Sequence, residues 1–145
     1  MQSWEARSAG RVVFLRLDRG DDLLDALAQA LARHGVRDGV VLSTVATFER
    51  CRLHQAQGTG FPIEEEILEL AGPVEVMQAS GVVASGQPHI HATVADRRGH
   101  AYGGHLEPGS TVLYLAEVAI LETVGTAMAR RPSPDGVQQL GPEQG

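Results

Sequence analysis

Cysteine, lysine and long apolar runs are scarce or absent in this chain, and each absence excludes a class of protein. With Cys51 as its one cysteine, the chain cannot form an intramolecular disulfide, which favours the cytoplasm over an oxidising compartment. No apolar run approaches the roughly 20 residues of a transmembrane helix, so no membrane partner is expected. The first residues, MQSWEARSAGR, lack the apolar segment of a secretory signal peptide.

Basic residues are few, all twelve are arginines, and the formal net charge is −6. DNA affinity comes largely from basic side chains that neutralise phosphates. An acidic chain without a basic run is therefore not expected to bind DNA non-specifically by itself. The 145 residues, 43% of them hydrophobic, fit one domain with an ordinary core.

Short strand patterns outnumber helical ones along the chain. Leucines at helical spacing after Asp21 and Asp22 predict one main helix that ends at Gly35. Residues 63–71 fit either a helix or a strand. The pattern predicts an α+β fold, a mostly antiparallel sheet with one main helix near the N-terminus. It divides the chain into a flexible arm, a single folded domain and a flexible tail, which are residues 1–10, 11–125 and 126–145.

Four of the six histidines fall in one short stretch, PHIHATVADRRGHAYGGHL. His89 and His91 are two residues apart in a predicted strand, so both side chains point to one face. A three-residue loop with Gly99 in the left-handed position would place His105 directly opposite His91, and Glu107 opposite His89. His100 would then face the other way. A two-residue loop, or a bulge at the glycine pair 103–104, would shift this register.

Three imidazoles on one face are the donor set of a zinc ion that keeps one coordination position open. The sequence therefore predicts a metal site formed by His89, His91 and His105. Zinc is the first choice, although imidazole also suits other divalent transition metals. The alternative is that these histidines are ordinary polar residues of a half-exposed sheet.

The chain resembles the plants-and-prokaryotes conserved (PPC) domain in its stand-alone bacterial form, over residues 11–125. The resemblance rests on RLDRGDDLLDALAQALARHGV, VVLSTVATFERCRLH, EEEILELAGPVEVMQASGVVAS, and the histidine stretch followed by LAEVAIL. It implies a homotrimer and, by analogy with plant members, association with DNA. The fold is also similar to that of acetolactate decarboxylase, and this implies His89, His91 and His105 as metal ligands. The AT-hook of plant members is missing, since Arg130-Arg131-Pro132 lacks its glycine.

Two functions follow from these features. The first is a homotrimeric DNA-associated or regulatory module that carries the three-histidine metal site. The second is a zinc-dependent lyase or hydrolase acting on a small carbonyl or ester compound, with Glu107 or Glu117 as general acid or base. Glu117 has the alternatives of an ion pair with Arg11 or Arg52, or a subunit contact. Cys51, in an alternating stretch, is predicted to be a packed strand residue rather than a nucleophile.

Overall fold

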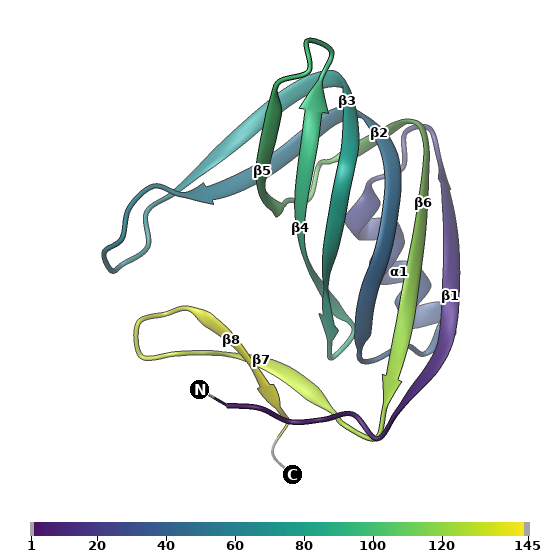
Figure 1. The fold of residues 1–145 in the computed structure, drawn as a ribbon, viewed down its shortest axis with the longest axis vertical. Coiled ribbons are helices and arrows are strands. Elements are labelled where there is room, and N and C mark those ends of the chain that lie inside the picture. The colour runs from purple at the N-terminus through teal and green to yellow at the C-terminus, as the bar shows by residue number, and fades with distance from the viewer. Residues whose placement is uncertain (1, 144–145) are drawn as a thin grey trace.

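One six-stranded sheet, antiparallel throughout and in the order β1-β6-β2-β3-β4-β5, carries most of the chain (Figure 1). The computed structural model describes residues 2–143. The elements are β1 (Ser8–Asp18), α1 (Leu23–His34), β2 (Gly39–Ala56), β3 (Glu65–Ala84), β4 (Gln87–Asp96), β5 (Ala101–Leu106), β6 (Thr111–Val124), β7 (Met128–Pro132) and β8 (Gln138–Pro142). The predicted α+β class, with one helix near the N-terminus, is confirmed. No helix in the described part is long and apolar enough to cross a membrane.

The single helix, α1, begins and ends at the residues that its capping chemistry requires. The Asp22 carboxylate accepts hydrogen bonds from the first free amides of the helix, those of Leu24 and Asp25. Gly35 ends the helix in the left-handed conformation, at φ 64°. Leucines at four-residue spacing form the buried stripe that packs on the sheet: Leu23, Leu27 and Leu31.

The core lies between α1 and the face of the sheet that the helix covers. Its largest strand side chains, Phe48, Ile90 and Ile120, are at most 1% exposed. Each such side chain stabilises the fold by about 1.5–3 kcal/mol through burial. Cys51 is fully buried in this core, where burial raises the pKa of its thiol to about 11. The prediction of a packed strand residue is confirmed, because a thiol with so high a pKa is a poor nucleophile at neutral pH.

Strand β2 is long enough to pair with different neighbours along its length. It pairs with β3 from Gly39 to Ala56, and its first part pairs with β6 on the other edge. Beyond Arg50, β5 replaces β6 as the neighbour of β2 on this edge, through the pairs Leu53 with Leu106 and His54 with His105. Strands β2, β3, β4 and β5 therefore close into a ring at one end of the sheet.

The ambiguous segment and the described parts of the two chain ends form regular structure. The first strand already begins at Ser8, and the chain from Glu65 onward forms β3 rather than a helix. The predicted flexible tail contains an antiparallel hairpin, β7–β8. Pro134 and Gly136 lie in the turn between the two short strands, where Gly136 has φ 86°. Residues 1, 144 and 145, which belong to the predicted arm and tail, lie outside the described residues.

Candidate metal centre

The β4–β5 hairpin has the predicted three-residue loop. Gly99 has φ 81°, and the Asp96 amide donates to the His100 carbonyl at 3.0 Å. His91 lies directly opposite His105, and the pairing has no register shift. The register prediction is confirmed, and the alternatives of a two-residue loop and a bulge are wrong. His100 instead turns to the loop, where its ring contacts the Asp96 carboxylate at 3.2 Å.

His89, His91 and His105 come together on one side of this hairpin. The Nε2 atoms of His89 and His91 are 3.3 Å apart. The ring centroid of His105 lies 4.6 Å from that of His89 and 5.6 Å from that of His91. Directly opposed and i, i+2 positions on the two strands produce this cluster, as the sequence predicts.

His54 is a fourth histidine of the cluster, and the sequence analysis missed it. It comes from the end of β2, where it pairs with His105, and the two ring centroids are 4.5 Å apart. The alternating pattern from Phe48 to His54 predicts the strand. Nothing in the sequence shows that this strand meets β5, because the contact depends on closure of the ring.

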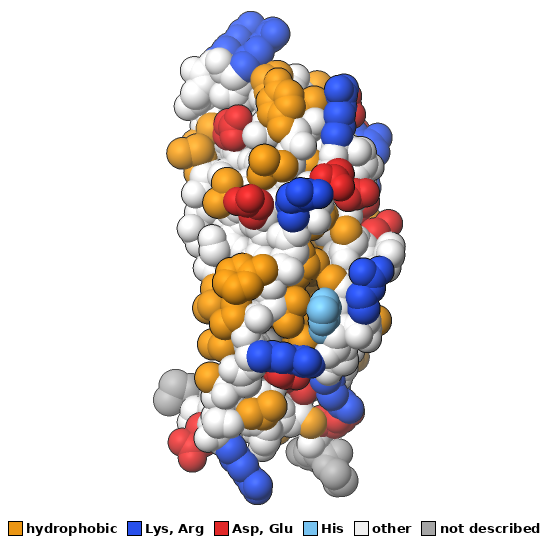
Figure 2. Space-filling model, turned by 90° about the vertical axis from the view of Figure 1, so that its right-hand side faces the viewer, with side chains coloured by type: hydrophobic (Ala, Val, Ile, Leu, Met, Phe, Trp, Pro, Cys, Tyr) orange, Lys and Arg blue, Asp and Glu red, His pale blue; other side chains and the backbone are white. Residues whose placement is uncertain are grey.

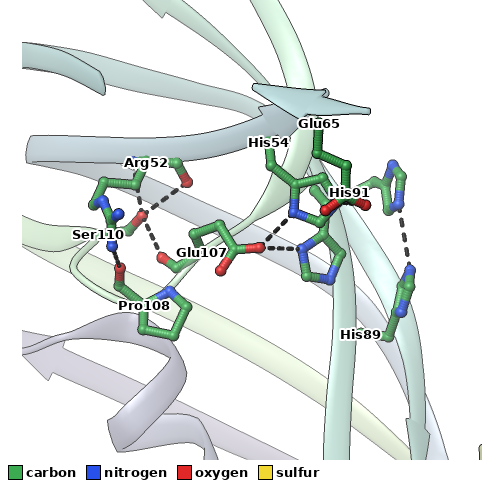
Figure 3. Close-up of polar contacts among 9 residues, drawn as sticks. Arg52, His54, Glu65, His89, His91, Glu107, Pro108 and Ser110 are labelled. Carbon is green, nitrogen blue, oxygen red and sulfur yellow. Dashed lines mark hydrogen bonds and ion pairs between the residues drawn. The ribbon is translucent and has the colours of Figure 1, made fainter. Parts of the chain in front are cut away.

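Glu107 lies between His54 and His105 (Figure 3). One of its carboxylate oxygens, Oε1, is 2.5 Å from His54 Nδ1 and 3.0 Å from His105 Nδ1. Burial raises the pKa of Glu107, but the hydrogen bonds and charges of these two histidines outweigh it, and the net pKa is lowered. Glu107 is therefore an ionised acceptor. It contacts His54 and His105, whereas the sequence predicts a position opposite His89.

The side chains of His89 and His91 are held in the neutral form that binds metal. Burial, followed by the charges of Arg130 and the neighbouring histidines, lowers the pKa of His89 to about 4. Burial and the charges of His105 and His54 also lower the pKa of His91. Because a histidine must be in its neutral form to coordinate a metal, both side chains are ready to bind at neutral pH.

Two overlapping donor sets share His105. One is the predicted set, His89, His91 and His105. The other is His54, His105 and Glu107, the one group of three among residues 2–143 whose ligand atoms all lie within 4.8 Å of one another. Nitrogen and carboxylate donors both suit zinc and related divalent ions. The residues present therefore fit a transition metal, and His105 belongs to either arrangement.

Glu117 does not belong to this site. It lies on β6, where it is paired with Arg16 of β1 on one side and with Val45 of β2 on the other. Along β2, Val45 is about 30 Å from His54. Of the two arginines predicted as alternative partners, Arg11 contacts Glu122 and Arg52 contacts Glu69. Its prediction as a general acid or base beside the histidines is therefore wrong.

Comparison with known proteins shows to which family the chain belongs. A family model described as the Plants and Prokaryotes Conserved (PCC) domain matches residues 5–124. The bifunctional protein GlmU of Synechococcus sp. (strain JA-2-3B'a(2-13)) is 33% identical over 120 residues, which are 83% of this chain and 18% of that protein. The chain thus spans less than a fifth of the length of this relative.

Solved structures share the fold over nearly the whole chain. A metal-containing protein from Archaeoglobus fulgidus is 26% identical, with a TM-score of 0.80 over 96% of this chain and 98% of that one. A PPC protein from Pyrococcus horikoshii is 22% identical, with a TM-score of 0.82 over 99% of each chain. A candidate DNA-binding protein from Bacteroides thetaiotaomicron is 17% identical, with a TM-score of 0.78 over 94% and 96%. The last two similarities concern the fold alone.

The family model covers the sheet from before β1 to the end of β6, including all four clustered histidines and Glu107. The chain belongs to the Plants and Prokaryotes Conserved domain family, abbreviated PCC or PPC.

Proposed function

We propose that this PPC-domain protein binds one divalent transition metal ion, zinc in the simplest case, through His89, His91 and His105. The observation that carries the proposal is the 3.3 Å separation of the His89 and His91 Nε2 atoms. In a tetrahedral zinc site with Zn–N bonds of about 2.0–2.1 Å, neighbouring nitrogens lie about 3.3–3.4 Å apart. A relative of the same fold is a metal-containing protein.

Glu107 and His54 orient the third ligand in this proposal. Glu107 accepts from His105 Nδ1, and this leaves Nε2 as the nitrogen that would face the ion. A carboxylate behind a metal-bound histidine fixes its tautomer and raises its basicity. His54 is held in turn between Glu107 at 2.5 Å and Glu65 at 3.5 Å.

Elemental analysis of tag-free protein purified without chelator tests the proposal. The expected result is about one transition metal ion per chain, removed by a chelator and restored by adding zinc. Protein that contains no metal and takes up none from a zinc solution would contradict the proposal. The clustered histidines would then be ordinary polar residues of the sheet.

The homotrimer is the second part of the proposal, and an exposed apolar face supports it. On the outer face of β1, β6 and β2, Phe14 is 78% exposed, Val45 57% and Val12 42%. Figure 2 shows hydrophobic side chains gathered on this side of the molecule. Contiguous exposed apolar side chains mark association surfaces. Glu117 and Arg16, paired across this face, would then be subunit contacts.

Replacing Phe14 with glutamate is expected to convert the trimer into monomers, because the carboxylate would be buried without a partner in the interface. Light scattering after size-exclusion chromatography measures the mass. The matched control is Phe61→Glu, the same change at a residue that is 61% exposed but lies in the loop between β2 and β3. A wild-type protein that is monomeric, or a Phe14→Glu variant that stays trimeric, contradicts this interface.

DNA association finds less support in this chain. The net charge is −6, and the Arg130-Arg131-Pro132 segment is part of β7 rather than a free basic arm. A regulatory role would therefore depend on partners, or on surfaces that only the trimer assembles.

A second candidate function is a zinc-dependent lyase or hydrolase for a small carbonyl or ester compound, with Glu107 as the acid or base. The proposed ligand set favours it, because three protein ligands would leave a position for water or substrate, as in catalytic rather than structural zinc sites. A bound zinc ion would polarise a carbonyl or activate water there. Glu107, ionised and 23% exposed, would accept or return a proton.

A further inference from the structure

The C-terminal hairpin is fastened next to the metal-binding strands. The buried Asp38 carboxylate accepts hydrogen bonds from the Met128 amide at 3.2 Å and from the Ser85 amide at 3.1 Å. The Ser85 hydroxyl donates to the Met128 carbonyl at 2.7 Å. The start of β7 is therefore fixed against the turn between β3 and β4, only four residues before His89 (Figure 1).

This attachment determines where Arg130 points. Met128 is 9% exposed and packs inward. Arg130 follows Met128 by two residues in the same strand, so its side chain points to the same, inward side of β7. The positive charge of Arg130 acts on His89, where it contributes to the lowered pKa.

Arg130 has no charge partner among residues 2–143. It forms none of the ion pairs between arginines and acidic side chains in that range. Its Nε atom is buried without a hydrogen-bond partner. An unpaired, partly buried guanidinium is unfavourable by itself, and beside a dication it would be more so.

We infer that Arg130 binds the carboxylate of a small organic acid that also reaches the metal ion held by His89, His91 and His105. The inference rests on the proposed function and adds the class of ligand. With a metal ion bound, the site would combine a dication and Arg130, and its two carboxylates, Glu107 and Glu65, are already engaged by His54 and His105. One further anion would balance this excess of positive charge. The planar guanidinium group of an arginine matches the geometry of a carboxylate.

The test uses acetate as the probe, followed by NMR of the arginine side-chain Nε–H groups and of the β4 amides. Acetate is titrated into zinc-loaded and into chelator-treated protein, and the Arg130 signal is assigned by its loss in Arg130→Gln. The Arg130 Nε–H signal and the β4 amides are expected to shift saturably in the zinc-loaded protein. Arg130→Gln is expected to weaken acetate binding about 10-fold or more, as for a charged hydrogen bond of about 1.5–3 kcal/mol.

Arg131→Gln is the matched control, since Arg131 is exposed and points to the other face of β7. It should bind acetate as the wild type does, and Arg130→Lys should be intermediate. An unshifted Arg130 signal, or equal acetate affinity in Arg130→Gln, overturns the inference. Metal content is measured on the same samples. Protein without zinc uptake contradicts the metal site, while a saturable Arg130 shift in it would still support an anion site.

Discussion

Replacing His91 with alanine is expected to abolish zinc binding at equimolar concentrations while the fold survives. The change removes one of three proposed ligands and breaks the 3.3 Å nitrogen pair with His89. His91 is an exposed side chain, and exposed substitutions usually change the free energy of unfolding by less than about 0.5 kcal/mol. Elemental analysis after dialysis against zinc measures the metal, and a thermal melt followed by circular dichroism measures the fold.

Two further variants separate the overlapping donor sets. His100→Ala should leave zinc binding unchanged, because this side chain faces Asp96 and solvent. His54→Ala should weaken binding about 10- to 100-fold, the usual effect of losing a residue that supports a ligand. If His54→Ala abolished binding and His91→Ala did not, the ion would lie among His54, His105 and Glu107, and the proposed ligand set would be wrong.

Replacing Gly104 with alanine is expected to lower both the stability and the zinc affinity. A Cβ atom at this position would lie 2.6 Å from the His54 carbonyl oxygen and 3.2 Å from the Leu53 Cβ. Strands β5 and β2 would have to separate at the point where the ring closes. Such overpacking costs about 1–3 kcal/mol, and the shift would move His105 away from Glu107 and His54. Urea denaturation and zinc titration measure the two effects.

The neighbouring Gly103 provides the matched control. A Cβ atom there would meet its nearest neighbours, the Ala92 carbonyl and the Thr93 hydroxyl, at 3.6 and 3.9 Å, which is ordinary contact. Gly103→Ala should therefore be nearly neutral in both measurements. Equal losses in the two variants would show that the glycine pair acts through chain flexibility rather than through close approach of β5 and β2.

The local parts of the fold were predictable because short-range rules determine them. Asp22 and Gly35 delimit the helix, and Gly99 selects the loop that brings His91 opposite His105. Alternation along a strand then places His89 on the same face. These inferences need only the period of a strand and the length of one loop.

The long-range parts were not predictable from one sequence. His54 joins the cluster because β2 exchanges β6 for β5 beyond Arg50, and no local pattern reports which strands become neighbours. The charge of Arg130 acts on His89 because Asp38 and Ser85 hold β7 in place, although the composition of that segment is typical of a tail. Glu117 lies in a strand that is mostly apolar in sequence. Only the assembled sheet shows that one face of this strand is exposed and that Glu117 lies on it.

Closure of the strand ring links metal supply to folding. The four histidines come from β2, β4 and β5, which are separated in the unfolded chain, so an unfolded chain offers no assembled site. An ion that binds only the folded form adds stability with its concentration, about 4.1 kcal/mol at a thousandfold excess over the dissociation constant. Under the proposed function, a cell short of the metal would hold a less stable population of this chain, and its steady-state level would follow metal availability.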